Sequence, residues 1–210
     1  MYIFDSTPLV FCETKRFFYM KDLTDYELWE ALKAGDVKAF SALFKMYYSL
    51  LHNYGLKISN HNVQLTEDCL QDFFIYIYEH RENLSSLKTI QPYLFVSFRR
   101  HIIKDIKKSL KNADTNPKDD HFIEINFSKE DLMIHQEIEV FKHTNLTILL
   151  NKLPNRQKEI LYLKYYSNLN NLEISKVMDI NYQSVSNLIH KGIKNLRQDA
   201  TLSQLLKNIT

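Results

Sequence analysis

Apolar side chains recur every three or four positions along most of the chain after Met20, which is the spacing of an amphipathic helix. The stripe is clearest in the N-terminal half, at Phe40, Leu43, Phe44, Tyr47, Leu50, Leu51 and Tyr54. Only 3 glycines and 4 prolines occur in 210 residues, so long runs pass without a helix breaker. The pattern predicts an all-α protein with little or no sheet.

Capping signals divide the N-terminal half into helices. Thr24-Asp25-Tyr26-Glu27 is a capping box, and Leu23 and Leu28 are spaced as its hydrophobic staple. Gly35-Asp36 predicts a break between two helices. The next helix is expected to begin at Thr66 as N-cap and to end near Arg81.

A third helix of this half is expected to begin near Pro92, a residue suited to a first helical turn. It is strongly basic, because residues 92–111 contain six Lys or Arg against the single Asp105. Aromatic rings beside cations are typical of nucleic-acid contacts, although a basic face can equally be only solvated. The candidate contacts are Tyr93, Arg99, Arg100, Lys104, Lys107 and Lys108.

The C-terminal third has the pattern of a helix-turn-helix that follows a scaffold helix, LPNRQKEILYLKYY. Asn170 and Glu173 form a second capping box, residues 179–181 predict the turn, and Asn181 is placed to cap the last helix. The alternative is an ordinary amphipathic helix of a small bundle. The last helix packs through Val185, Leu188, Ile189, Ile193 and Leu196, which recur at helical spacing.

The opposite face of that last helix carries amides, hydroxyls and cations, the groups that read base edges and neutralise phosphates. Residues 182–198 contain three cations and no carboxylate. We therefore expect this helix to enter a DNA groove. Its candidate contacts are Tyr182, Gln183, Ser184, Ser186, Asn187, His190, Lys191 and Lys194.

Charge separates two domains. Residues 112–144 contain eight carboxylates and three cations, which predicts an acidic linker between an N-terminal helical bundle and the C-terminal helix-turn-helix domain. The expected boundaries are 21–110, 111–144 and 145–210, after an extension over 1–20. Because the helical pattern starts only after Met20, that residue is a candidate for the true start.

Several classes of function are not indicated. Cys12 and Cys69 are isolated, so neither a disulfide framework nor a zinc site is expected, and a reducing cytoplasmic setting is the default. The histidines are scattered, and no glycine-rich phosphate loop or hydrolase motif occurs. The longest apolar run, Phe73–Tyr78, is too short to span a bilayer. We expect no enzyme, no metal and no cofactor.

The order of these elements resembles the sigma factors of bacterial RNA polymerase, of the two-domain extracytoplasmic-function (ECF) type. The resemblance covers about residues 25–108 and 153–197. TEDCLQDFFIYIY is similar to the family's segment that docks on the clamp helices of the polymerase largest subunit, and PYLFVSFRRHIIKDIKK to the segment that opens the −10 element. LPNRQKEILYLKYY and EISKVMDINYQSVSNLIHKGIKNLR are similar to the domain that reads the −35 element.

The resemblance implies a transcription initiation factor that brings core RNA polymerase to promoters. Its partners would be the clamp helices and flap of the polymerase, promoter DNA and an anti-sigma factor. The basic helix would bind the −10 element and the last helix the −35 element. The polymerase would be bound through Glu67, Asp68, Gln71, Asp72 and Phe74.

Four positions depart from the family pattern. Tyr93 stands where Trp is usual, Arg100 where Asn is usual and Lys104 where Asp is usual, so the helix is more basic than expected. Asp179 replaces a common Gly in the turn, and Asp tolerates the left-handed conformation better than most residues. The bases preferred at −10, the promoter set and the inducing signal are not encoded in any recognisable pattern.

Two other functions remain open at this point. Response regulators of two-component systems end in a similar four-helix unit, so a stand-alone transcriptional regulator is one alternative. The N-terminal half lacks the alternating strand and helix pattern of a receiver domain, which argues against it. A helical adaptor that binds only protein, with both basic surfaces merely solvated, is the other alternative.

Overall fold

The computed structural model describes residues 23–111, 125–127 and 140–198, and these residues form helices and no strand. In chain order the elements are α2 (Asp25–Lys33), α3 (Val37–Ile58), α4 (Val63–Glu79), the 3-10 helix η1 (Arg81–Asn83), α5 (Ile90–Lys111), α7 (Val140–Asn151), α8 (Asn155–Tyr165), α9 (Asn171–Met178) and α10 (Tyr182–Gln198). The predicted all-α class is confirmed. The extension 1–20 and most of the predicted acidic linker lie outside the described residues.

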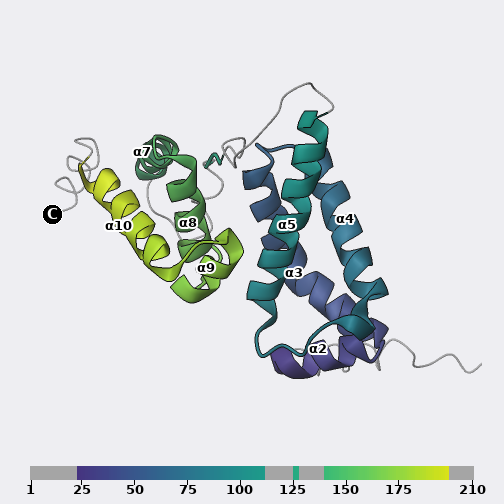
Figure 1. The fold of residues 1–210 in the computed structure, drawn as a ribbon. Coiled ribbons are helices and arrows are strands. Elements are labelled where there is room, and N and C mark those ends of the chain that lie inside the picture. The colour runs from purple at the N-terminus through teal and green to yellow at the C-terminus, as the bar shows by residue number, and fades with distance from the viewer. Residues whose placement is uncertain (1–22, 112–124, 128–139, 199–210) are drawn as a thin grey trace, which may run out of the picture.

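The helices gather into two groups, which Figure 1 shows side by side. We call α2 to α5 the N-terminal block and α7 to α10 the C-terminal block. In the N-terminal block, α3, α4 and α5 pack along one another and α2 lies across one end. Trp29 of α2 is fully buried there, donates its indole N–H to the Ser85 carbonyl at 2.8 Å and meets the Tyr93 ring edge-on at 5.2 Å.

The helix starts show which capping signals the fold uses. The Thr24 capping box is confirmed, and Asp36 caps α3 directly after Gly35, whose φ is +87°. The predicted start at Thr66 is wrong, because α4 already begins at Val63 with Asn62 as its cap. Thr66 is fully buried, and its hydroxyl donates to the Asn62 carbonyl at 2.8 Å rather than capping. α5 begins at Ile90, two residues before Pro92.

The two blocks touch along α5. This helix lies between α4 and the C-terminal block in Figure 1 and packs against α9. The short described segment 125–127 adds to the contact, because the Asn126 side chain donates to Asn60 of the N-terminal block at 3.3 Å. The Phe127 backbone is held by the Asn151 side chain of α7 through two hydrogen bonds, of 2.8 and 3.0 Å. The basic helix and the helix-turn-helix therefore belong to one packed unit.

Candidate nucleic-acid interface

The helix-turn-helix has the local structure that its sequence predicts. The Asn170 side chain accepts from the N–H groups of Leu172 and Glu173 at 2.9 and 3.0 Å, and the Asn170 N–H donates to the Glu173 carboxylate at 2.8 Å. Asp179 ends α9 in the left-handed conformation, with φ 53° and ψ 49°. The Asn181 side chain then accepts from the Ser184 N–H at 2.7 Å and caps α10. Both caps and the turn are confirmed.

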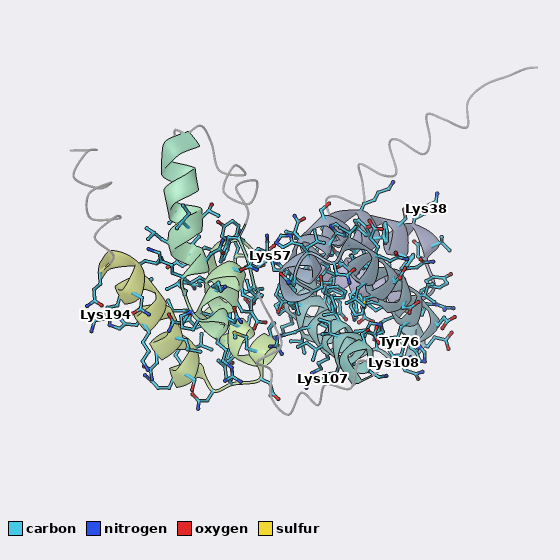
Figure 2. The ribbon with its side chains drawn as sticks, turned by 90° about the horizontal axis from the view of Figure 1, so that it is seen from above. Lys38, Lys57, Tyr76, Lys107, Lys108 and Lys194 are labelled. Carbon is cyan, nitrogen blue, oxygen red and sulfur yellow. The ribbon has the colours of Figure 1, made fainter. Side chains whose placement is uncertain are left out.

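One side of α10 is packed and the other is open. Val185 is fully buried, and Gly192 lies so close to Leu161 of α8 that an added Cβ would come within 3.2 Å of its methyl carbon. The exposed residues of the helix include six of the eight predicted base or phosphate contacts, namely Tyr182, Gln183, Asn187, His190, Lys191 and Lys194. Lys194 points away from the N-terminal block in Figure 2. The other two, Ser184 and Ser186, are half-buried.

Two amides on the open face of α10 bind each other. The Gln183 side-chain N–H donates to the Asn187 side-chain oxygen at 3.1 Å, across one helical turn. Ser186 accepts a long hydrogen bond, 3.4 Å, from the Asn171 amide at the start of α9. The open face therefore carries a pre-oriented amide pair beside two exposed lysines, which can present donors and acceptors to a base edge and cations to phosphates.

The basic helix α5 presents its cations toward the turn of the helix-turn-helix. Arg100, Lys104 and Lys108 are exposed, and they line an open groove of about 700 Å³ whose other wall includes Arg156 of α8 and Asp179 of the turn. Figure 2 shows Lys107 and Lys108 at the rim of the N-terminal block. Tyr93, by contrast, is half-buried against Trp29. The groove gathers cations from both blocks.

Arg99 differs from the other predicted contacts on α5, because it is buried in an ion pair with Glu159 of α8. Its Nε lies 2.7 Å from Glu159 Oε1 and its Nη2 lies 3.3 Å from Oε2, and the two side chains are 9% and 3% exposed. The Tyr54 hydroxyl of α3 donates to the same Oε1 at 2.8 Å. Burial, and then the negative charge of Glu159, raise the pKa of Tyr54 well above its ordinary value. In this arrangement Arg99 is not presented to DNA.

The polar side of α4 is accessible. Glu67, Asp68, Gln71 and Asp72 are exposed on the helix that lies farthest from the C-terminal block in Figure 1. Phe74 is 2% exposed and packs against Phe44 at 4.9 Å between ring centres, so this structure does not present it to a partner protein. Phe74 lies on the core-facing side of α4.

Two apolar side chains missed by the sequence reading lie on the exposed surface of α4. Ile75 is 45% exposed and Tyr76 is 52% exposed. They follow Asp72 by three and four positions, so they share its side of the helix. The exposed side is therefore mixed acidic and apolar, which suits contact with another protein.

The Cys69 thiol of the N-terminal block is buried. Cys69 donates to the Asp105 carboxylate at 3.2 Å, and burial together with this hydrogen bond raises the pKa of the Cys69 thiol to about 12.

Over the described residues no group of three or more His, Cys, Asp or Glu side chains is placed to hold a metal ion. No helix in the same part of the chain is long and apolar enough to cross a membrane.

Comparison with known proteins agrees with this geometry. Residues 144–196, which include α8, α9 and most of α7 and α10, match the family model described as sigma-70, region 4. The chain is also similar to the ECF RNA polymerase sigma factor SigM of Bacillus subtilis (strain 168), with 24% identity over 155 residues that cover 74% of this chain and 91% of SigM. The C-terminal block thus matches the sigma-70 family, and most of the chain is similar to an ECF sigma factor.

Two solved structures share the fold of this chain. The structure of CnrH in complex with the cytosolic domain of CnrY matches with a TM-score of 0.54 and 15% identity, over 89% of this chain and 99% of that chain. The sigma factor RpoE in complex with the anti-sigma factor NepR from Bartonella quintana matches with a TM-score of 0.52 and 15% identity, over 80% and 98%. The similarity thus extends over both helical blocks.

A further match covers only part of a longer protein. The chain is 27% identical to trigger factor of Buchnera aphidicola subsp. Schizaphis graminum (strain Sg) over 133 residues, which are 63% of its length. The chain spans only 28% of trigger factor, so the match leaves most of that protein without a counterpart.

Proposed function

We propose that this sigma factor binds core RNA polymerase and directs it to promoters by contacts at two elements, −10 and −35. The observation that carries the proposal is α10, a capped helix with an open face of amides and cations, inside the segment that matches sigma-70 region 4. An α-helix of this kind fits the major groove of B-DNA. The N-terminal block would supply the second DNA contact and the polymerase contact.

Each role is proposed for a particular surface. The exposed residues of α10 would read the −35 element, with Gln183 and Asn187 on base edges and Lys191 and Lys194 on phosphates. Arg100, Lys104, Lys107 and Lys108 of α5 would engage the −10 region. The clamp helices of the polymerase would bind α4 through Glu67, Asp68, Gln71 and Asp72, with Ile75 and Tyr76 in place of the buried Phe74.

The proposed units follow the boundaries expected from the sequence: a region 2-like domain over 21–110, a linker over 111–144 and a region 4-like domain over 145–210. An anti-sigma protein is proposed as a third partner, supported by the solved structures of CnrH with CnrY and of RpoE with NepR. A factor of this kind works beside the polymerase in the cytoplasm and needs no catalytic group of its own, because the polymerase performs the chemistry.

Binding to the polymerase is tested by size-exclusion chromatography of the chain with sigma-free core enzyme. The wild type should co-elute with the core, whereas Asp68→Arg with Gln71→Ala should not, because the double substitution reverses a charge on the exposed side of α4. The matched control is Glu82→Arg with Asn83→Ala, an equal change of charge on the exposed 3-10 helix η1. It should co-elute like the wild type.

The outcome separates the candidate functions. If the wild type does not co-elute, the sigma function is refuted, and DNA binding by the chain alone would favour a stand-alone regulator. If neither polymerase nor DNA binds, the helical adaptor is favoured. If both double variants co-elute, the chain is a sigma factor but α4 is not its polymerase contact.

Base reading is tested with DNA selected from a random library by the wild-type complex with polymerase. Gln183→Ala or Asn187→Ala should weaken binding to the selected −35 sequence by about 1–3 kcal/mol, roughly 5- to 150-fold, and change binding to random DNA much less. Equal losses on both kinds of DNA would mean that these amides do not contact bases.

A further inference from the structure

The groove between α5 and the helix-turn-helix has the size and the lining of a site for a small ligand. Its volume is about 700 Å³, within the usual range for pockets that hold small molecules. We propose that it binds a nucleoside polyphosphate, with the phosphates on the cations of the groove and the base against its apolar side chains. The binding is independent of the proposed function, whereas its effect on −10 DNA rests on that function.

Four cations of the groove are available to a ligand. Arg100, Lys104 and Lys108 of α5 and Arg156 of α8 line it and are exposed. In the part of the chain that the structure describes, their side chains form no hydrogen bond and no ion pair. None of them therefore has to give up a protein partner to bind a phosphate oxygen, and each such contact is a charge-assisted hydrogen bond.

Three of these cations form a row along one side of α5. Arg100, Lys104 and Lys108 follow one another at intervals of four residues, over about 12 Å of the helix axis. Like charges at this spacing repel each other and destabilise a helix. The neighbouring Asp105 is engaged elsewhere, because its carboxylate accepts from the Cys69 thiol at 3.2 Å. A chain of several phosphates fits the length of the row and would relieve the repulsion.

Apolar side chains form another part of the lining. Val177 and Met178 of α9, Ile180 of the turn and Ile103 of α5 all border the groove. Phosphate groups gain nothing from such a surface, but the flat ring of a base does, because branched side chains and the methionine sulfur pack favourably against aromatic rings. The lining therefore favours a ligand with a polyanionic part and a ring over inorganic phosphate.

Arg156 distinguishes the groove from a surface that binds DNA only. It belongs to α8, whereas the cations proposed for the −10 region all belong to α5. Because α5 packs against α9, the groove has side chains of both blocks around it. Asp179 is the carboxylate among the lining residues, so the cations remain in excess. A small polyanion can be held between these walls by cations from both blocks.

Binding is measured by isothermal titration calorimetry of the full chain, without DNA or polymerase and without Mg²⁺, which would itself bind the phosphates. ATP is the probe, and it should bind with a dissociation constant below about 1 mM. Tripolyphosphate, which lacks the ring, should bind about fivefold more weakly or worse. No binding of ATP would overturn the proposal. Equal affinity for ATP and tripolyphosphate would also overturn it, because the apolar lining would then have no role.

Two pairs of variants locate the ligand. Lys104→Gln and Arg156→Gln should each weaken ATP binding by about tenfold, because each removes a charged hydrogen bond to a phosphate. The matched controls are Lys38→Gln in α3 and Lys176→Gln in α9, which remove exposed cations outside the groove and should bind ATP like the wild type. All four positions are exposed, so circular dichroism should show unchanged helix content.

The pattern of losses decides between the groove and other modes of binding. An equal loss in all four variants would mean general attraction to a basic protein, and it would overturn the site. A loss in Lys104→Gln without one in Arg156→Gln would mean that the ligand lies on α5 alone, and this result would overturn the groove as well.

Competition with DNA is the expected consequence for function. The α5 cations are the ones proposed for the −10 region, so ATP at about ten times its dissociation constant should weaken binding to a selected −10 fragment by about tenfold. Binding to a selected −35 fragment should not change, because no residue of α10 is among those that line the groove. ATP binding without competition would support the ligand site and refute the use of these cations at −10. Failure of both fragments to bind without ATP would instead refute the proposed function, and calorimetry alone would then decide on the ligand.

Discussion

Replacing Gly55 of α3 by alanine should strain the packing of α3 against α4 and α5 and lower the stability of the N-terminal block. Gly55 lies inside α3, and a Cβ built there would come within 2.6 Å of the Thr66 Cγ2 methyl of α4 and within 3.1 Å of the Phe98 ring of α5. Carbon atoms normally meet at 3.5–4.0 Å. Both neighbours are fully buried, and the Thr66 rotamer is held by two hydrogen bonds of its hydroxyl.

The expected loss follows from two opposing terms. Forcing a methyl group into a packed interior costs about 1–3 kcal/mol, and the rigid neighbours of Gly55 favour the upper end. Replacing Gly by Ala within a helix returns about 1 kcal/mol. Gly55→Ala should therefore lower the free energy of unfolding by about 2 kcal/mol, which moves the urea midpoint down by roughly 1 M.

The assay is urea unfolding followed through the fluorescence of Trp29, the single tryptophan, which lies in the same block. Gly192→Ala in α10 is the matched control, because its Cβ would meet a flexible Leu161 methyl at 3.2 Å. That variant should be as stable as the wild type or more so. Gly55→Ala combined with Thr66→Ser, which removes Cγ2 and keeps the hydroxyl, should recover most of the loss. An unchanged midpoint for Gly55→Ala alone would refute the reasoning.

Three further outcomes are expected. Lys191→Ala should flatten the log-log salt dependence of −35 binding by about 0.9, and an unchanged slope would remove that lysine from the phosphate contacts. Asn170→Ala should destabilise the C-terminal block by about 1 kcal/mol in urea unfolding, whereas Asn170→Ser should not, because serine also caps. In a Cys12→Ser background, the Cys69 thiol should react with a disulfide reagent at pH 8 only on unfolding. Burial and the hydrogen bond to Asp105 raise the pKa of the folded Cys69 thiol from 9.0 to about 12. The protonated thiol therefore contributes to the stability of the folded state in full below pH 9, and this contribution is lost as the pH rises toward 12. Labelling of the folded chain at the unfolded rate would contradict the burial of the thiol.

Local signals in the sequence were sufficient for the helices that begin at capping boxes. Thr24 with Glu27, and Asn170 with Glu173, each satisfy two backbone donors within four residues, so no distant contact is needed to place them. The predicted start of α4 was wrong because local signals alone could not choose between two caps. Asn62 and Thr66 are both suitable caps, and only burial of Thr66 in the core decides between them.

Contacts between distant segments were not predictable in the same way. Arg99 was counted with the cations of a DNA-binding helix, because nothing in its neighbourhood distinguishes it from Arg100. Its partner Glu159 is 60 residues away, on a scaffold helix whose charged residues carry no periodic signal. Phe74 was placed among the partner contacts by analogy with a family segment, whereas the side of α4 on which it lies is set by packing against α3.

The hydrogen bond between Gln183 and Asn187 has a consequence for how promoter preference changes in evolution. Because the two amides orient each other at 3.1 Å, in the proposed complex each residue would present to DNA the groups that its partner leaves free. Substitution of one alters the presentation of the other, so the two positions should show strong epistasis in a double-mutant cycle. Single mutations are then expected to broaden the range of −35 sequences that are bound. A switch of preference to a different −35 sequence should require substitutions at both positions.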